Sequence, residues 1–229
     1  MVGFSILKRE VIKTGLCVRC GTCIGICPVN ALDIRDVLGK CEPQQIGKCM
    51  ECGLCIQTCP GKSFDFGLST TNQNNLHSHP VLGKFIRIFV GYCHDKDIRH
   101  RGASGGMGTA ILLHLLDEQE IDGAVVLDYS TDRPYFPEVR LVNDRKDIIK
   151  AAQSKYFTFP QNKILKVLRE SSFKKVAYFG LPCQVHGIKK ALQEGVSGTE
   201  KIKYILGCYC GNNLFYEATL SLFKRFGFD

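Results

Sequence analysis

One pattern of cysteines appears twice near the start of the chain, and it constrains the fold more than any other feature. The two stretches are CVRCGTCIGICP, residues 17–28, and CMECGLCIQTCP, residues 49–60. Each reads C-x2-C-x2-C-x3-C-P, and together they hold eight of the thirteen cysteines. Three thiols at steps of three residues gather on one side of a short loop, and the fourth follows just beyond it. The chain must therefore fold around whatever these thiols bind, or around disulfides between them.

Disulfides, zinc and iron–sulfur clusters are the three candidates for this pattern. Disulfides belong mainly to secreted proteins, and the opening residues, MVGFSILKREVIK, lack the long apolar core and cleavage site of a secretory signal. We therefore expect a cytoplasmic chain. Zinc takes four ligands, usually from two C-x2-C pairs, so three closely spaced cysteines in each copy would leave a surplus. The spacing is instead that of the bacterial ferredoxins with two [4Fe–4S] clusters.

In that arrangement the first three cysteines of each copy bind one cluster, and the fourth binds the other cluster. Gly21 and Gly53 follow the second cysteine of each copy and allow a tight backbone around the sulfurs. The predicted ligands of the first cluster are Cys17, Cys20, Cys23 and Cys59, and those of the second are Cys49, Cys52, Cys55 and Cys27. Two neighbouring clusters carry single electrons, so the repeat predicts an electron relay.

The distribution of cysteines also divides the chain, because nine of the thirteen lie between residues 17 and 59. We predict a ferredoxin-type domain over residues 1–68, a polar linker over 69–83 and a second domain over 84–229. The apolar pieces 31–34 and 63–66 follow the two Cys-Pro turns and are predicted to form short strands. Cys41 lies outside both copies, and we interpret it as a free loop cysteine in preference to an extra ligand.

Residues 84–229 alternate between strand and helix patterns. Strands are predicted at 84–93, 121–130, 138–142, 175–180 and 202–210, with 138–142 antiparallel to its neighbour. Helices are predicted at 104–119, 144–153 and 161–171, after 181–184, and from about 213 onward. Strands separated by such helices predict an α/β domain with a mixed, largely parallel sheet. The predicted fold class is therefore α+β: a small two-cluster ferredoxin domain followed by an α/β domain.

Several residues of the second domain suit binding or redox chemistry. The stretch RHRGASGGMG, residues 99–108, enters a helix through glycines, so it suits either a pyrophosphate or an ordinary helix start. Its spacing matches neither the dinucleotide-binding nor the P-loop glycine pattern. Cys183 is either a thiol of lowered pKa at a helix N-terminus or a small packed residue. Cys208 and Cys210 stand two residues apart at a strand end and are expected to face the core together.

The remaining charged and polar residues indicate no further site. The formal net charge is +8, but the basic residues are scattered and are not interleaved with aromatic residues. We therefore expect no nucleic-acid partner. No apolar run approaches the length of a membrane span, which predicts no spanning segment. The isolated histidines His77, His79 and His186 are interpreted as structural or exposed residues.

The order of the motifs resembles that of one known family. The cysteine repeats are followed by IRHRGASGGMGTAILLHLL, IDGAVV, QSKYF, YFGLPCQ and LGCYCG. In this order they resemble the beta-subunit family of coenzyme F420 hydrogenases and dehydrogenases, over nearly the whole chain from residue 15. Members of that family usually continue further, so the resemblance implies that the second domain is either truncated at its C-terminus or completed by a partner chain.

The resemblance implies an oxidoreductase subunit with FAD in the second domain. The flavin would exchange a hydride with F420, or another small hydride carrier, and pass single electrons to the two [4Fe–4S] clusters. The clusters would then serve a redox partner subunit or a ferredoxin. The resemblance assigns no catalytic residue, and the flavin contacts that it implies are Arg101, Ser104, Gly105, Gly106, Ser154, Lys155, Tyr156, Pro182 and Cys183.

Three other functions stay open from the sequence. One is a flavin and iron–sulfur reductase of the same family that uses ferredoxin and another organic substrate. A second is a pure electron-transfer adaptor whose second domain docks to a partner and binds no flavin. A zinc-bearing nucleic-acid binder is the most distant alternative.

Overall fold

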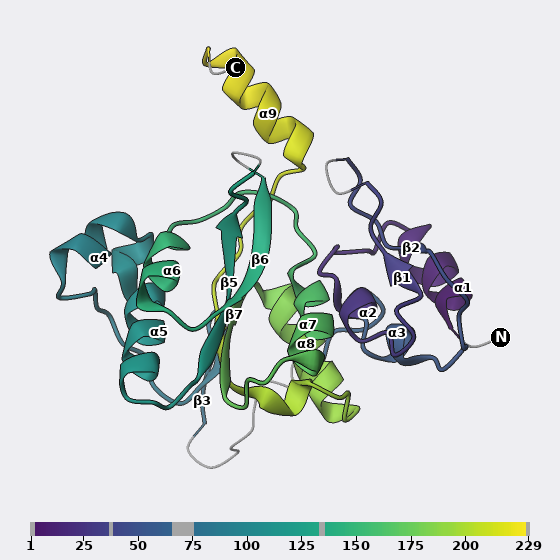
Figure 1. Ribbon diagram of the computed structural model, residues 1–229, viewed down its shortest axis with the longest axis horizontal. Coiled ribbons are helices and arrows are strands. Elements are labelled where there is room, and N and C mark those ends of the chain that lie inside the picture. The colour runs from purple at the N-terminus through teal and green to yellow at the C-terminus, as the bar shows by residue number, and fades with distance from the viewer. Residues whose placement is uncertain (1–2, 37–38, 66–75, 133–135, 228–229) are drawn as a thin grey trace.

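The computed structural model describes residues 3–36, 39–65, 76–132 and 136–227. Figure 1 shows two parts side by side: the N-terminal segment, residues 3–65, and the sheet region, residues 76–227. Within these described ranges, no helix has both the length and the apolar character needed to cross a membrane. The first half of the predicted linker lies outside the described residues, and the domain boundaries stay predictions.

The N-terminal segment consists of short elements around a small apolar core. In chain order these are α1 (Phe4–Leu7), the π-helical turn η1 (Lys8–Ile12), α2 (Thr22–Gly25), β1 (Leu32–Asp33), β2 (Gln44–Gln45) and α3 (Leu54–Gln57). β1 and β2 pair antiparallel. Phe4, Leu7 and Val11 from the first two helices are buried against Ile24 and Leu32. The core is small because the cysteines of both copies occupy much of the space beside it.

Of the two short strands predicted here, one is confirmed and one is wrong. Residues 31–34 contain β1, but residues 63–65 form no strand, and Phe66 lies outside the described residues. The Phe64 ring instead stacks on the His186 ring, with centroids 4.0 Å apart. Residues 63–65 therefore pack against the sheet region, and β1 pairs with β2, which lies between the two copies of the repeat.

The sheet region is built on four strands in the order β6–β5–β7–β8. Their bounds are β5 (Gly123–Tyr129), β6 (Pro137–Val142), β7 (Val176–Gly180) and β8 (Ile202–Gly207). β5 pairs antiparallel with β6 and parallel with β7, and β7 pairs parallel with β8. The predicted mixed, largely parallel sheet is thus confirmed, and each of these strands falls where the sequence predicted one.

Side chains alternate between the two faces of the sheet, as they must in a strand. Ala124 and Val126 of β5 pack with Leu112 of α5 (Met107–Asp117) and Ile148 of α6 (Arg145–Lys150). Val125, between them, packs on the opposite face with residues of three helices. These are η4 (Gln161–Ile164), α7 (Leu165–Glu170) and α8 (Pro182–Gln193). The helices predicted near these ranges are confirmed.

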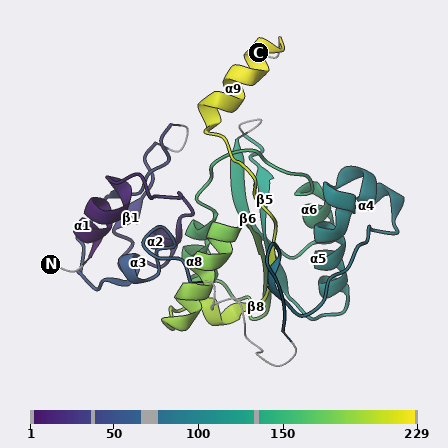
Figure 2. The same cartoon turned by 180° about the vertical axis from the view of Figure 1, so that it is seen from behind.

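The N-terminal segment lies on the α7–α8 side of the sheet, whereas α4 (Lys96–Arg101), α5 and α6 cover the other side (Figures 1 and 2). The contact is direct, because the Lys166 ammonium of α7 donates a hydrogen bond to the Leu32 carbonyl of β1 over 3.1 Å. A layer of helices therefore separates the cysteine-rich segment from the sheet.

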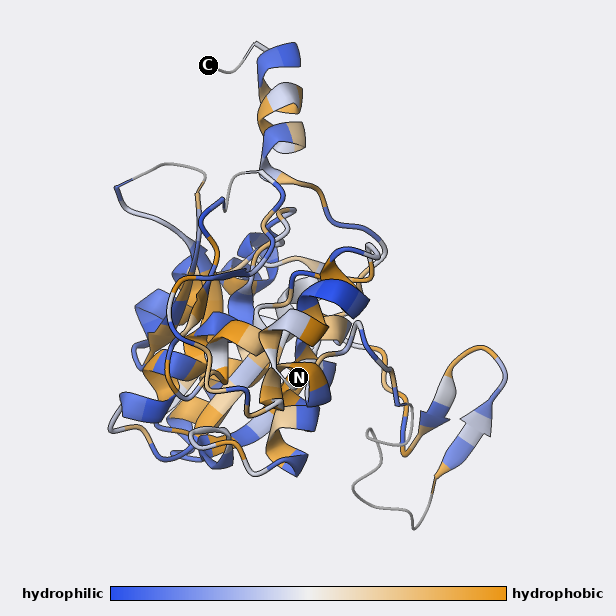
Figure 3. Cartoon of the chain, turned by 90° about the vertical axis from the view of Figure 1, so that its right-hand side faces the viewer, coloured by the Kyte–Doolittle hydropathy of each residue, from blue (hydrophilic) through white to orange (hydrophobic). Residues whose placement is uncertain are grey.

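The strand predicted at residues 84–93 is wrong for most of its length. Only β4 (Gly83–Phe85) is a strand, and it pairs with β3 (His77–His79) in a hairpin that projects from the body of the protein (Figure 3). Residues 86–93 belong to no strand and have no sheet partner, and Phe89 and Val90 are exposed. The apolar pattern of this stretch is typical of a strand, but a pattern carries no information about the pairing partner.

The C-terminal part of the sheet region corrects one further expectation. β8 ends at Gly207, so Cys208 and Cys210 lie beyond the strand, and both are exposed instead of facing the core. The short turn η5 (Thr199–Lys201) precedes β8, and α9 (Tyr216–Arg225) follows it. The helix predicted from about residue 213 is confirmed, and it extends away from the sheet (Figure 1).

Candidate metal centres and redox site

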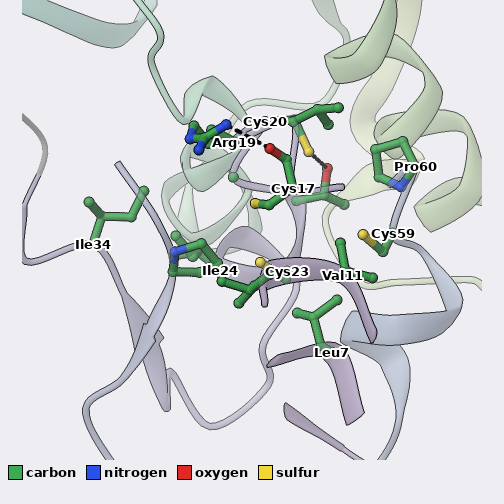
Figure 4. A pocket seen from close by; sticks show the side chains of 15 residues that line it. Leu7, Val11, Cys17, Arg19, Cys20, Cys23, Ile24, Ile34, Cys59 and Pro60 are labelled. Carbon is green, nitrogen blue, oxygen red and sulfur yellow. Dashed lines mark hydrogen bonds between the residues drawn. The ribbon is translucent and has the colours of Figure 1, made fainter. Parts of the chain in front are cut away.

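Four cysteines line a hollow at the inner side of the N-terminal segment, which we name the first hollow (Figure 4). Three of them come from the first copy of the repeat and one from the end of the second copy: Cys17, Cys20, Cys23 and Cys59. The apolar side chains of Leu7, Val11 and Ile24 complete the wall. The hollow has an empty volume of about 390 Å³, which includes open solvent.

The other four cysteines of the repeat line a second hollow, with an empty volume of about 330 Å³ including open solvent. They are Cys49, Cys52, Cys55 and Cys27. Phe4 and Leu54 contribute apolar wall, and Cys52 is exposed. The structure therefore brings the eight cysteines together in the two groups that the spacing predicted, with the fourth cysteine of each copy exchanged.

The backbone explains how each copy directs its sulfurs to one side. Arg19 and Glu51, at equivalent positions, both adopt the left-handed conformation with φ 57°. Gly21 and Gly53 follow two residues later, also left-handed, with φ 83° and 79°. α2 and α3 begin directly after these glycines. These left-handed residues curl the chain so tightly that the first three cysteines of each copy line one hollow.

The thiols of these cysteines are free and largely shielded from water. All thirteen cysteines are free, so none of them forms a disulfide. Burial raises the pKa of Cys20 to about 12 and that of Cys55 to about 12, because the thiolate loses its hydration. A thiol in such surroundings gives up its proton only when a metal cation takes its place. The donor set therefore fits iron–sulfur clusters.

Cys41, the ninth cysteine of the N-terminal segment, lines neither hollow. It is fully buried, with φ 53°, and burial raises its pKa to about 11. The prediction of a free cysteine agrees with this placement.

Contacts from the sheet region reach the first hollow directly. The backbone N–H of Asn162 donates to the Cys20 carbonyl over 2.9 Å, and the Lys190 ammonium donates to the Cys59 carbonyl over 3.2 Å. The side chain of Asn162 donates to the hydroxyl of Thr22, between Cys20 and Cys23, over 2.8 Å. Sequence reasoning missed Thr22, Asn162 and Lys190, since nothing in the local pattern of either segment reports a contact across more than a hundred residues.

Glycines make this close approach possible. A Cβ atom at Gly25 of α2 would lie 2.0 Å from the Asn162 carbonyl oxygen, and one at Gly187 of α8 would lie 2.1 Å from the Thr22 hydroxyl. One at Gly21 would lie 2.5 Å from the Pro160 carbonyl oxygen. These three glycines are the signal in the sequence that could have indicated the contact.

The first group of predicted flavin contacts surrounds the start of α5. Arg101 ends α4, and Ser104, Gly105 and Gly106 form the turn η3 (Ser104–Gly106), all three left-handed with φ 48°, 71° and 74°. Gly106 is the N-cap of α5 and offers no side chain to the N–H groups of the first turn. The free N–H groups and the positive end of the helix suit an anionic group such as a phosphate.

Close packing also explains why glycines occupy this turn. A Cβ atom at Gly105 would lie 2.9 Å from Cβ of Tyr92, and one at Gly106 would lie 2.8 Å from the Ile98 carbonyl oxygen. Gly108 in the first turn of α5 packs against the Phe179 ring of β7, where a Cβ atom would lie 2.8 Å from the ring. The start of α5 is thus held near the carboxyl end of β7, the usual edge for ligands in α/β folds.

The second group of predicted flavin contacts follows α6. The Lys155 ammonium donates to the carbonyls of Ala151 and Ala152 over 2.5 and 2.7 Å and lies 5.5 Å from the centre of the Tyr129 ring. Burial lowers the pKa of Lys155 to about 8. Lys155 therefore closes the C-terminus of α6 beside the end of β5. Ser154 and Tyr156 are exposed beside it.

The third group is the turn between β7 and α8. Pro182 begins α8, and Cys183 follows it, partly buried. Burial raises the pKa of Cys183, so the possibility of an activated thiol of lowered pKa is wrong for this environment. His186 in the same helix is buried, and its Nε2 accepts a hydrogen bond from the Asp65 N–H over 3.2 Å, which agrees with a structural role.

Comparison with known proteins defines the class of the N-terminal segment first. Residues 16–63 match the 4Fe-4S dicluster domain. This match and the two hollows lined by cysteines make the chain an iron–sulfur protein of the electron-carrier class. Residues 88–166 match the N-terminal part, and residues 173–229 the C-terminal part, of the coenzyme F420 hydrogenase/dehydrogenase beta subunit. The chain belongs to this family, as its motifs indicated.

Several named proteins are similar to the chain. The coenzyme F420-dependent sulfite reductase of Methanocaldococcus jannaschii is 30% identical over 96% of this chain and 34% of its own length. The beta subunit of the coenzyme F420 hydrogenase of Methanosarcina barkeri is 29% identical over 62% of this chain and 50% of its own. A subunit of the F(420)H(2) dehydrogenase of Methanosarcina mazei is 28% identical over 92% of this chain and 58% of its own.

The chain is also similar to a chain of a solved structure. A chain in the F420-reducing [NiFe] hydrogenase complex from Methanosarcina barkeri superimposes with a TM-score of 0.54 at 28% identity, over 58% of this chain and 47% of that chain. The present chain thus spans between about a third and three-fifths of the length of these relatives.

Proposed function

We propose that the chain is a subunit of an F420-linked oxidoreductase that holds FAD and two [4Fe–4S] clusters. In this function the sheet region exchanges a hydride with F420, and the N-terminal segment passes the electrons singly to a partner protein. The two relatives that align over 96% and 92% of this chain are named as a coenzyme F420-dependent sulfite reductase and an F(420)H(2) dehydrogenase subunit, which supports F420 as the substrate. We also propose that the protein is cytoplasmic and that its partner is a redox subunit or a ferredoxin.

The grouping of the eight cysteines carries the proposal. Each hollow receives three sulfurs from one copy and one from the other, as two neighbouring [4Fe–4S] clusters require. Among the described residues, no three histidine, cysteine or acidic side chains come close enough to hold a single metal ion. Sulfurs that surround a hollow without converging on one point favour a cluster over zinc.

The backbone of the sheet region supports the proposal that it binds FAD. When bound, a flavin links the two-electron chemistry of a hydride carrier to one-electron carriers. In the proposed site the uncapped first turn of α5 would hold a pyrophosphate through backbone N–H groups. Arg101 would add positive charge at the same turn, while the turns that contain Tyr156 and Pro182 would form the neighbouring walls.

Anaerobic purification of the full-length protein tests this function. We expect about eight iron and eight sulfide per chain, with bound FAD, and reduction of both flavin and clusters by F420H2. Reduced ferredoxin, offered as the alternative donor, distinguishes the related reductase that acts on another organic substrate. Iron and sulfide without flavin would support the adaptor function instead, and zinc with little iron would exclude the proposal.

A pair of cysteine variants makes the metal assay specific. Cys20→Ser removes a proposed ligand of the first cluster, and the iron content should fall by about half, because each cluster holds half of the iron. Cys41→Ser is the matched control, since Cys41 is also buried but lines neither hollow. Equal loss of iron in both variants would contradict the assignment of ligands.

A further inference from the structure

A buried chain of hydrogen bonds links the sheet region to the sulfur of Cys20. The Tyr178 hydroxyl of β7 bonds Oδ1 of Asn162, and Nδ2 of Asn162 donates to Oγ1 of Thr22 over 2.8 Å. Oγ1 of Thr22 lies 3.1 Å from Sγ of Cys20, the bond that Figure 4 draws at that sulfur. Cys20 is a proposed ligand of the first cluster, so the chain of bonds ends on the cluster's own donor atom.

The direction of each bond in this chain is fixed by its neighbours. Nδ2 of Asn162 also lies 2.9 Å from the carbonyl oxygen of Gln184, which only accepts, so the atom that faces it must be the amide nitrogen. The second hydrogen of that nitrogen goes to the Thr22 oxygen. The hydroxyl hydrogen of Thr22 is then left for the sulfur of Cys20, and Thr22 is the donor.

Water does not compete for these positions. Thr22 is 1% exposed, Asn162 and Tyr178 are each 0% exposed, and Cys20 is 7% exposed. The hydrogen bond to the sulfur is therefore a fixed part of the structure, in surroundings where electrostatic effects are stronger than in water.

The second copy of the repeat has no equivalent side chain. Leu54 occupies the position of Thr22, directly before the third cysteine, and its side chain has no donor. Backbone N–H groups reach sulfurs in both copies, from Arg19 to Cys17 and from Glu51 to Cys49. The hydroxyl of Thr22 is thus an addition to the pattern that the two copies share.

The charged side chains also differ between the two copies of the repeat. The Arg19 guanidinium donates to the Cys17 carbonyl over 2.9 Å, and the Lys190 ammonium donates to that of Cys59. Glu51 takes the place of Arg19 in the second copy, which sets an anion where the first copy has a cation. Two cationic side chains therefore lie beside the first hollow, and one of them, Arg19, also pairs with Glu42 over 3.5 Å.

We propose that Thr22, held in place by Asn162 from the sheet region, donates a hydrogen bond to the Cys20 thiolate and thereby raises the reduction potential of the first cluster. This inference rests on the proposed function, because it requires a cluster on Cys20. Reduction adds one electron to the cluster from the donor, with no bond broken and no proton moved. The added negative charge spreads onto the sulfurs, where a hydrogen-bond donor stabilises it.

The consequence is a favourable first step. The hydrogen bond makes the cluster that touches the sheet region more readily reduced than it would be without the hydroxyl, so an electron that leaves the flavin has a better first acceptor. Because Asn162 and Tyr178 belong to the sheet region, docking of the two parts of the chain sets the potential of that cluster. Thr22 and Asn162 are positioning residues in this account.

A redox titration followed by electron paramagnetic resonance tests the inference on the full-length protein, with dithionite as reductant. Thr22→Val keeps the shape of the side chain and removes the hydroxyl. We expect the equilibrium constant for reduction of one cluster to fall by about tenfold, which is a shift of about −59 mV for one electron. The other cluster should keep its potential, and Thr22→Ser should restore the first.

Thr58→Val is the matched control. Thr58 is as buried as Thr22 and precedes Cys59, but its hydroxyl donates to the Leu54 carbonyl over 2.9 Å instead of to a sulfur. Its loss should leave both potentials unchanged. Thr22→Ala, which places no methyl group against Asn162, gives a second test of the same shift if Thr22→Val does not fold.

The outcomes separate this inference from the function on which it rests. If both clusters keep their reduction potentials when the Thr22 hydroxyl is lost, the effect proposed for Thr22 is contradicted, but the proposed function is not. Equal shifts in Thr22→Val and Thr58→Val would also contradict it, because they would indicate a general effect of packing. A protein without two titrating clusters would contradict the proposed function as well.

Discussion

At the scale of single residues, the cysteines were predictable and their neighbours were not. Spacing alone indicates the two groups of four, because three ligands on one short loop is a local property of the chain. The contact of Asn162 with Thr22 joins residues 140 positions apart, and no local pattern encodes it. Lys155 shows the same limit: its ammonium donates to the carbonyl of Ala151 at the end of α6, which the motif does not report, and its role as a flavin contact stays a prediction.

The contact between α2 and α8 gives a test at this scale. In Gly187→Ala, the new Cβ atom would lie 2.1 Å from the Thr22 hydroxyl, so Thr22 or the helix must move. An alanine inside a helix ordinarily stabilises it by up to about 1 kcal/mol, but overpacking costs about 1–3 kcal/mol. We expect a net loss of stability, measured as a lower melting temperature, by about 2–4 °C for each kcal/mol.

Gly91→Ala is the control for this substitution, because a Cβ atom at Gly91 meets nothing within 4 Å. Its melting temperature should match that of the unaltered protein under the same anaerobic conditions. An unchanged or raised melting temperature in Gly187→Ala would mean that the two helices can separate without loss.

At the scale of elements, the strands of the sheet were predictable because each has its own apolar run between turns. β5 through β8 fall at their predicted places. The predictions at 63–66 and 84–93 were wrong because both stretches have strand-like composition without a strand beside them. Residues 63–65 pack on α8, and residues 86–93 have no sheet partner in the described chain. Pairing is a property of the whole fold, which composition does not report.

The contact of residues 63–65 with α8 predicts a dependence on pH. Nε2 of His186 accepts a hydrogen bond from the Asp65 N–H, so the ring must be neutral. Burial lowers the pKa of His186, and the nearby Lys190 charge lowers it further. As pH falls below about 6.5, the unfolded chain takes up a proton before the folded chain does, so stability is lost.

Melting temperatures at pH 7.5 and 5.5 measure this effect. The decrease on acidification should be smaller in His186→Gln than in the unaltered protein, since glutamine does not titrate. His114→Gln, at an exposed position on α5 outside this contact, is the control and should keep the full decrease. If His186→Gln shows the same decrease as the unaltered protein, His186 does not couple the two parts of the chain to pH.

At the scale of the whole molecule, the two hollows have different surroundings. The first lies where the N-terminal segment meets the sheet region, because Cys20 and Cys59 both accept hydrogen bonds from that region. The second includes the exposed Cys52. This arrangement orders the proposed carriers: sheet region, first cluster, second cluster, partner. The sequence could not give this order, because the two copies are almost alike as patterns.

The order predicts that the two clusters have separable roles. Cys52→Ala should remove the second cluster, while the contacts of the first hollow with α8 and η4 stay intact. F420H2 should then still reduce the first cluster and a small dye, which can approach the partly exposed Cys17 directly. Electron delivery to a protein acceptor such as a ferredoxin should fall by about tenfold or more, equivalent to about 1.4 kcal/mol in the barrier.

Rates of dye and ferredoxin reduction on the same preparation measure this separation, and Cys41→Ser supplies the control with both rates intact. The physical reason is access: a dye reaches any exposed carrier, whereas a folded protein partner needs a carrier at the outer surface of the N-terminal segment. Equal loss of both rates in Cys52→Ala would mean that the second cluster comes before the first in the relay. Equal retention would mean that the partner takes its electrons from the first cluster, at the boundary between the two parts of the chain.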